Sequence, residues 1–314
     1  MKLNTLLKIK YPILQGGMAN IATGKFAAAV SNAGGLGIIG CGGLTTEQLR
    51  EEIHVVREHL TDKSTPFGVN IMLLNPCAEE ISKMVVEEKV PVLTTGAGNP
   101  ASYLPMWKEA GILVFPVVAS VALAKRLEKY GADGLIAEGM ESGGHVGETT
   151  TMALVHQVVE AVDIPVIAAG GVGSGAQMAA ALAMGASGVQ VGTCLLVSDE
   201  CPIHENYKQA VIKAKDSSTT VTGRSVGVPV RLIKNKMARE YLNLEKTITD
   251  KMELEKLTLG SLRKAVFDGD VEMGSLMAGQ VAGQMTEIRP VATILAELDH
   301  DCKARLQQTT KLWG

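Results

Sequence analysis

One unit recurs eight times along this chain: a short apolar run rich in Val and Ile, followed by a longer stretch with helical spacing of apolar and charged residues. The apolar runs predict strands at 11–15, 36–40, 67–72, 90–95, 112–118, 134–138, 164–169 and 188–191. The stretches between them predict helices near 23–32, 45–59, 78–89, 102–110, 120–130, 150–162 and 174–184. Few folds accommodate so regular an alternation.

Strands that are apolar on both faces and are joined by helices belong in a parallel sheet covered on both sides. Eight such units close into a (β/α)8, or TIM, barrel. An open doubly wound sheet is the alternative, but it usually has fewer units, and a dinucleotide-binding one has G-x-G-x-x-G after its first strand. Here the first strand leads into Gln15-Gly16-Gly17-Met18. We therefore predict an α/β fold of the barrel type.

The alternation stops after Val197, and residues 199–284 have the pattern of irregular helices around a Thr-rich passage at 217–222. We interpret this segment as a smaller, mainly helical cap inserted before the last barrel helix, which is predicted near 290–312. The predicted domains are an FMN-binding barrel at 1–198 and 285–314 and a helical cap or substrate domain at 199–284.

Composition excludes several classes of protein. A chain of 314 residues that is 46% hydrophobic can bury a large core, and a formal net charge of −3 does not suit a protein that binds nucleic acid. No apolar stretch reaches the ~18 residues of a membrane helix, and the first ten residues have no signal-peptide core, so we expect a cytoplasmic protein without membrane contact. The five cysteines lie far apart, and neither a disulfide framework nor a metal site is expected.

Barrel enzymes place their chemistry at the carboxyl ends of the strands. The polar residues expected there include only one carboxylate, which argues against a divalent-metal hydrolase, and no lysine suited to a Schiff base. Amides and hydroxyls suit a neutral heteroaromatic ring such as a flavin. In an alternative interpretation, the two amides at 15 and 70 only tie down neighbouring loops. The strand-end residues are Gln15, Asn70, Thr94, Thr95, Ser120, Glu138 and Gln190.

Glycine-rich turns follow the last two predicted strands, at 170–175 and at 192–193. Turns at these two positions form the phosphate site of many barrels, because bare backbone N–H groups and a helix N-terminus bind a dianion. A ring among amides together with one phosphate describes FMN. These turns contain Gly171, Gly173, Gly192 and Thr193.

A histidine, His145, lies in a glycine-rich loop at 138–148 that follows the sixth strand. An imidazole in a mobile loop over the barrel mouth can exchange a proton near neutral pH, although a lone histidine in a polar loop is by default simply exposed. We predict that His145 is catalytic and that Ser142, Gly144 and Met277 contact the substrate. Methionine offers an adaptable lining for a flexible apolar chain and is equally well explained as core filler.

Several segments together resemble the FMN-dependent enoyl-[acyl-carrier-protein] reductase II family, a branch of the nitronate monooxygenase-like barrels. The resemblance covers nearly the whole barrel and part of the cap. Within the superfamily it favours the reductase, because monooxygenase relatives tend to have Pro in place of Gly17 and an uncharged residue in place of Glu138. The resembling segments are 11–19, 33–39, 67–73, 138–147, 165–171, 189–193 and 274–280.

The resemblance implies that NADH or NADPH reduces FMN, and that hydride then passes to the β-carbon of a trans-2-enoyl thioester held on acyl carrier protein, the last reductive step of fatty acid elongation. It places His145 beside the substrate carbonyl, where it polarises the developing enolate or supplies a proton. It leaves open the choice of NADH or NADPH, the acyl range and a monovalent cation. It assigns the isoalloxazine and ribityl groups to Gln15, Gly16, Gly17, Met18, Asn70 and Glu138, and the phosphate to Gly171, Gly173, Gly192 and Thr193. Thr95 is a further predicted cofactor-binding residue.

The sequence departs from the family pattern at two positions. Asn20 replaces a common Trp, and Cys194 replaces a common Arg, which affects packing at the flavin edge and charge compensation at the phosphate. Acyl carrier protein is acidic, so we predict that a basic cluster docks it: Arg231, Lys234, Lys236 and Arg239. A solvated helix face is the alternative for this cluster. We also expect a homodimer.

Three other functions compete with the reductase. A nitronate monooxygenase would use the same barrel, FMN and a comparable histidine. A barrel like that of inosine-monophosphate dehydrogenase would need a cysteine nucleophile after the sixth strand, and the loop at 139–149 has none. A non-catalytic flavin- or phosphate-binding sensor is the alternative from outside the enzymes.

Overall fold

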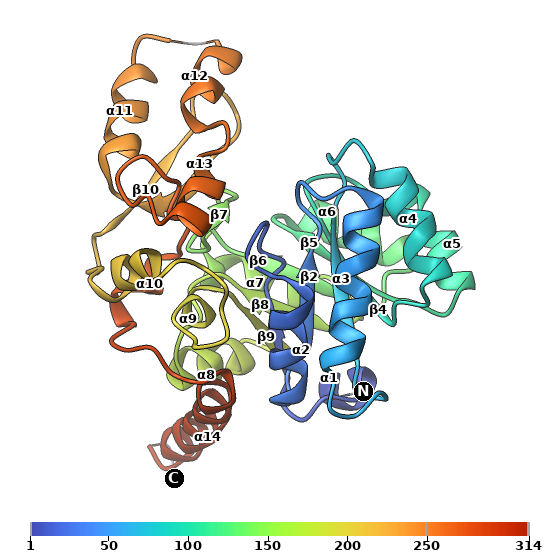
Figure 1. Ribbon diagram of the computed structural model, residues 1–314. Helices are drawn as coiled ribbons and strands as arrows, with labels where there is room; N and C mark the ends of the chain where they lie inside the picture. The colour runs from blue at the N-terminus through green and yellow to red at the C-terminus, as the bar shows by residue number, and fades with distance from the viewer. Residues whose placement is uncertain (1, 249, 313–314) are drawn as a thin grey trace.

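The computed structural model of the protein describes residues 2–248 and 250–312 (Figure 1). Eight parallel strands follow one another in the order β1-β9-β8-β6-β5-β4-β3-β2, and a bridge between Leu14 and Leu36 brings β1 against β2. The predicted (β/α)8 barrel is confirmed, and each predicted strand overlaps an observed one. The barrel strands are β1 (Ile13–Gln15), β2 (Gly37–Gly40), β3 (Phe67–Met72), β4 (Val92–Gly96), β5 (Leu113–Val118), β6 (Leu135–Glu138), β8 (Val166–Ala169) and β9 (Gly188–Val191).

Local signals fix the ends of the barrel helices. Thr45 and Gln48 form a reciprocal capping box at the start of α3, in which each side chain accepts a hydrogen bond from the other residue's backbone N–H. Gly111, Gly131 and Gly185 have φ values of 74°, 90° and 94°, the left-handed conformation expected after a helix. The helices are α2 (Gly24–Asn32), α3 (Thr46–His59), α4 (Ala78–Glu87), η1 (Pro100–Ser102), α5 (Leu104–Glu109), α6 (Val121–Lys129), α7 (Thr151–Val159), α8 (Gly175–Ala183) and α14 (Val291–Thr310).

A short helix that the sequence did not indicate, α1 (Leu3–Leu7), closes the amino-terminal end of the barrel. Its buried Leu3 and Leu7 belong to the same cluster as Leu14, Leu36 and Ile38, whose side chains fill the barrel interior. Five residues are too few to show a helical period, so this helix could not be found from pattern alone.

The inserted segment is mainly helical, as predicted, but it also contributes two strands. β10 and β11 pair antiparallel, and β11 pairs with the two-residue strand β7 (Gly144–His145) in the loop after β6. The Thr-rich passage therefore forms a strand of a three-stranded sheet that joins the insertion to the barrel mouth (Figure 1). A short helix, α9 (Thr193–Leu196), precedes the insertion. The elements of the insertion are α10 (Glu205–Ile212), β10 (Thr219–Thr222), β11 (Val230–Ile233), α11 (Lys236–Leu244), α12 (Lys251–Thr258), α13 (Ser261–Arg263), η2 (Lys264–Asp268) and η3 (Gln280–Gln284).

The two connections between barrel and insertion lie side by side. Ser198 and Arg289 form an isolated parallel bridge there. The buried ammonium of Lys208, on α10, donates to the Ser198 carbonyl oxygen at 2.6 Å. The division into domains at 198/199 and 284/285 stays a prediction. Among residues 2–248 and 250–312, no helix has the length and apolarity to cross a bilayer.

Candidate active site

A cavity of about 430 Å³ lies at the carboxyl ends of the barrel strands, beneath the loop after β6. This volume falls within the roughly 300–1,000 Å³ that ligand sites of cofactor size occupy. The inserted segment covers one side of the cavity with residues 277–279 and 281. The structure brings most of the predicted site residues together here, namely Gly16, Gly17, Met18, Asn70, Glu138, Ser142, Gly144, His145, Gly171, Gly192, Thr193 and Met277.

The turn after β1 depends on a glycine. A Cβ atom on Gly17 would lie 2.2 Å from the Cβ of Asn70, a separation that side chains cannot adopt. Asn70 itself is oriented by the Thr94 hydroxyl, which donates to its Oδ1 at 2.9 Å. Gly17 therefore makes room for an oriented amide at the floor of the cavity.

Gln15 does not line the cavity. Its side chain is fully buried, and its Oε1 accepts a hydrogen bond from the backbone N–H of Ile38 at 3.2 Å. It thus supplies a contact between β1 and β2 beyond the point where their backbones pair. The hydrogen bond of Oε1 agrees with the alternative interpretation, in which Gln15 only ties down its neighbours. The buried Nε2 atom has no hydrogen-bond partner among the described residues.

Bare backbone forms the opposite side of the cavity. Gly170 and Gly171, after β8, have φ values of 86° and 73°, and Gly192 lies immediately before α9. A Cβ on Gly170 would lie 2.6 Å from the carbonyl oxygen of Gly139, so side chains are excluded from this turn. The Thr193 hydroxyl accepts from the N–H of Gly279 at 2.9 Å and so joins the turn to the insertion.

These residues fit FMN. The glycine turns after β8 and β9 leave backbone groups uncovered for an anionic tail. The buried Ser142 hydroxyl, which lines the cavity, has no hydrogen-bond partner among the described residues, and a buried polar group of this kind needs one. Asn70 and Glu138 add polar groups for a ring with its own donors and acceptors.

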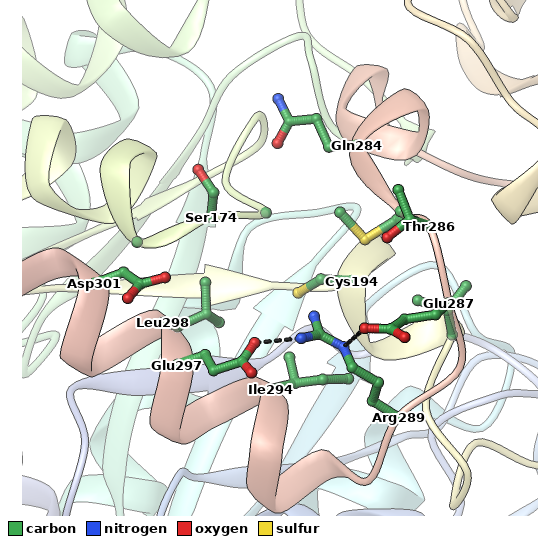
Figure 2. A pocket seen from close by; sticks show the side chains of 14 residues that line it. Ser174, Cys194, Gln284, Thr286, Glu287, Arg289, Ile294, Glu297, Leu298 and Asp301 are labelled. Atoms are coloured by element: carbon green, nitrogen blue, oxygen red, sulfur yellow. Dashed lines mark hydrogen bonds and ion pairs between the residues drawn. The ribbon is translucent and has the colours of Figure 1, made fainter.

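Besides Gln15, two other predicted cofactor residues lie outside the cavity. Thr95 does not line the cavity, because successive residues of a strand point to opposite faces and Thr94 takes the inner position beside Asn70. Gly173 lines a second cavity of about 190 Å³ between the start of α8 and helix α14 (Figure 2).

The second cavity is bordered mainly by polar and charged side chains. Arg289 forms an ion pair with Glu297 and lies 3.6 Å from Glu287 (Figure 2). Cys194, which departs from the family pattern, also lines this cavity. Its burial raises the pKa of the thiol to about 12, so the neutral thiol is the form present at pH 7.

Burial shifts the pKa values of both titratable groups that we predicted at the site. It raises the pKa of the Glu138 carboxyl to about 7. Burial also lowers the pKa of His145, although its side chain is accessible from the cavity mouth. At neutral pH, the imidazole is therefore mainly uncharged and Glu138 is divided between its two protonation states.

Sequence reasoning missed Glu141, which also lines the cavity. Its carboxylate accepts hydrogen bonds from the backbone N–H and the hydroxyl of Thr151, at 2.7–3.1 Å, and so fixes the loop to the start of α7. The sequence feature that could have identified Glu141 is its position as a second carboxylate in the loop that contains Glu138 and His145.

The predicted basic docking cluster needs a correction. Arg231 is only 4% exposed, because it lies on β11 between two other strands, and it is not available to a partner. Lys234, Lys236 and Arg239 are exposed. The cluster spans a strand and the following helix, so the helical spacing we assigned to it was wrong.

Comparison with known proteins gives consistent results. A model of the nitronate monooxygenase family matches residues 1–301. A probable nitronate monooxygenase of Staphylococcus aureus is 35% identical over 95% of this chain and 96% of its own length. The structure of FabK from Thermotoga maritima superposes with a TM-score of 0.95 at 47% identity, over 99% of this chain and 98% of that one.

A nitroalkane oxidase of Streptomyces ansochromogenes superposes with a TM-score of 0.86 at 28% identity, over 98% of this chain and 99% of that one. The barrel architecture, the glycine turns and the histidine loop are thus found in a chain that matches its relatives from end to end. The chain belongs to the nitronate monooxygenase family, a family of flavoprotein oxidoreductases whose expected cofactor is FMN.

Proposed function

We propose that this protein is an NAD(P)H-dependent enoyl-[acyl-carrier-protein] reductase that uses FMN and acts in fatty acid elongation. The observation that carries the proposal is the 47% identity to FabK of T. maritima, a name given to enoyl reductases of type II, across 99% of the chain. The corresponding identity to a probable nitronate monooxygenase is 35%. Gly17 and Glu138, the two positions that favour the reductase within the resemblance, both line the cavity.

The cofactor would be held mainly by backbone groups. Gly171 and Gly192 would contact the phosphate, and the turn at 16–18 with Asn70 would contact the ring and its chain. FMN, when bound, supplies two-electron redox chemistry between a nicotinamide and the enoyl substrate. Glu138, with its pKa near 7, can donate or accept a hydrogen bond there according to its protonation state.

His145 acts on the thioester in this proposal. Its lowered pKa makes the neutral imidazole the main form at pH 7, and a neutral ring still presents one N–H donor. That donor can stabilise negative charge that develops on the thioester oxygen as the β-carbon is reduced. The α-carbon then takes up a proton, either from water or from the minor protonated form of the imidazole, which returns to its neutral form.

The acyl chain would lie against the inserted segment. Met277 and Ala278 border the cavity beside Gly144, and a Cβ on Gly144 would lie 3.7 Å from the Met277 sulfur, an ordinary contact distance. Tyr207, fully buried on α10, donates from its hydroxyl to the Met277 carbonyl oxygen at 2.7 Å and holds this side of the cavity in place. Ser142 and Gly144 complete the proposed substrate contacts.

The test separates the two half-reactions. We expect NADH or NADPH to bleach the flavin absorbance of the holoenzyme under anaerobic conditions, and a short trans-2-enoyl thioester to restore it. His145→Ala should leave bleaching intact and slow the recovery by about 10²- to 10⁴-fold, the usual contribution of a positioned acid or electrophile. A wild-type enzyme whose reduced flavin is not reoxidised by any enoyl thioester would contradict the proposal.

The second candidate is nitronate monooxygenase activity, which the matching family model and the S. aureus relative favour. In that case a nitronate would reduce the flavin without a pyridine nucleotide, and oxygen would be consumed in proportion to the nitronate. Parallel assays with NADH plus enoyl thioester and with nitronate plus oxygen distinguish the two activities on one preparation.

Acyl carrier protein is the proposed carrier of the substrate, and the exposed Lys234, Lys236 and Arg239 are the proposed docking cluster. Lys236→Glu with Arg239→Glu should raise KM for an acyl-carrier-protein substrate and leave KM for the corresponding CoA thioester unchanged. Equal effects on both substrates would remove the cluster from the proposal. We also propose a cytoplasmic location, which cell fractionation tests. A homodimer is proposed as well, and light scattering of the purified protein tests it.

A further inference from the structure

The orientation of His145 depends on its backbone. Its side chain is exposed, although partial loss of solvent lowers its pKa. The backbone of His145 pairs with Val230 of β11, and the next N–H, of Val146, donates to the Pro229 carbonyl oxygen at 3.1 Å.

Arg231, the residue after Val230, holds the loop at two places. Its backbone is opposite Gly144 in the β11–β7 pairing. Its guanidinium passes beneath the loop, where Nε donates to the Met140 carbonyl oxygen at 3.1 Å and one terminal nitrogen donates to the Thr219 hydroxyl at 3.0 Å. Arg231 thus connects three parts of the structure: its side chain contacts the first turn of the loop and β10, and its backbone pairs with β7.

Burial of this guanidinium is costly unless its contacts are kept. Arg231 is 4% exposed, burial lowers its pKa, and its hydrogen bonds go to neutral oxygen atoms. Hydrogen bonds to neutral oxygen atoms do little to offset the free-energy cost of removing the guanidinium charge from water. Its rigid planar fork, in contrast, fixes the relative positions of the groups that it joins.

We propose that Arg231 is a positioning residue that places His145 over the cavity by fixing both ends of the 140–144 segment. The inference rests on the role proposed for His145 and extends it to a residue of the insertion. Arg231 touches neither cofactor nor substrate, since it does not line the cavity. Its effect on catalysis must therefore pass through the loop.

A double-mutant cycle with His145 tests this coupling. Arg231→Met keeps the length and apolar stem of the side chain and removes its donors. In the wild-type background it should slow reoxidation of the reduced flavin by the acceptor about 10- to 100-fold, the loss expected from a displaced catalytic group. In the His145→Ala background the same change should cost less than about twofold, because the positioned group is already absent. Equal losses in both backgrounds would overturn the proposal.

Controls separate positioning from a loss of folding. Arg126→Met changes an exposed arginine on α6 and should leave both half-reactions unchanged. Flavin content and the rate of bleaching by NADH should also be unchanged in Arg231→Met. If that variant does not fold, Thr219→Val removes only one of the two guanidinium contacts and should show the same dependence on His145 with a smaller loss.

A readout without turnover keeps this inference separate from the proposed function. The imidazole resonances of His145, assigned by comparison with His145→Gln, should shift in Arg231→Met holoenzyme and not in Arg126→Met. If enoyl thioesters prove not to be substrates, the cycle is measured with a nitronate as the reactant. Unchanged resonances together with additive rate losses would show that Arg231 does not position His145.

Discussion

The barrel and the inserted segment hold their parts of the cavity by different means. The cofactor side consists of turns that follow parallel strands of the eight-stranded sheet, and Gly17, Gly171 and Gly192 expose their backbone there. The side with His145 consists of a two-residue strand bound to a hairpin some 85 positions later in the chain, where Arg231 is opposite Gly144. One side is part of the barrel framework and the other is an attachment to it.

This difference separates two tasks. Turns at the ends of a closed sheet have little freedom, which suits groups that must bind the same cofactor in every cycle. A short strand with few pairing partners can open locally at a small cost in free energy, which suits a loop that admits and releases substrates. Changes in the barrel turns should therefore alter flavin binding, and changes in the insertion should alter the acceptor step.

The largest effect is expected at Gly17. Gly17→Ala places a methyl group 2.2 Å from the Asn70 Cβ and must displace that side chain or the turn. We expect FMN to bind about 100-fold more weakly, which corresponds to the ~3 kcal/mol upper range of overpacking. Titration of apoprotein with FMN measures this. Flavin retention in Gly17→Ala would place the cofactor elsewhere.

The next effect concerns Glu138 and pH. A carboxyl whose folded pKa is raised to about 7 costs stability once it ionises, so its penalty is absent below the ordinary pKa near 4.5 and complete above 7. Glu138→Gln removes the ionisation. It should raise the free energy of unfolding of the apoprotein by about 2 kcal/mol at pH 8, relative to its effect at pH 4.5. Urea unfolding at both pH values measures the difference, and a pH-independent effect would mean that Glu138 is ionised normally.

The smallest effect is expected at Tyr207, on the insertion. Tyr207→Phe removes the hydrogen bond to the Met277 carbonyl oxygen and should lower the free energy of unfolding by about 1 kcal/mol. Because this contact supports the substrate side, KM for the thioester should rise while the FMN dissociation constant stays constant. If flavin binding weakened and KM did not change, the division between the two regions would be wrong.

The barrel was predictable because its signals are local. Each strand is an apolar run with its own turn, so 67–72 and 188–191 coincide with β3 and β9, and the Thr45 capping box marks α3. Glycine turns after the last two strands also predicted where Gly171 and Gly192 would meet. Each of these features is determined by residues that lie within a few positions of one another in the sequence.

The errors arise where distant parts of the chain decide the environment. Arg231 resembles its exposed neighbours Lys234 and Lys236 in sequence, and only the pairing of β11 with β7 buries it. Thr94 and Thr95 are equivalent in sequence, and the register of β4 in the closed sheet determines that Thr94 faces Asn70. A pattern of single residues does not contain this long-range register.

Helix α1 has a consequence for the order of events. Leu3 and Leu7 close the amino-terminal end of the barrel and apolar side chains fill its interior, so the cavity opens toward the carboxyl ends of the strands. In the proposed reductase, the nicotinamide and the enoyl thioester would therefore both approach from this end. A shared approach would favour departure of the first reactant before the second arrives.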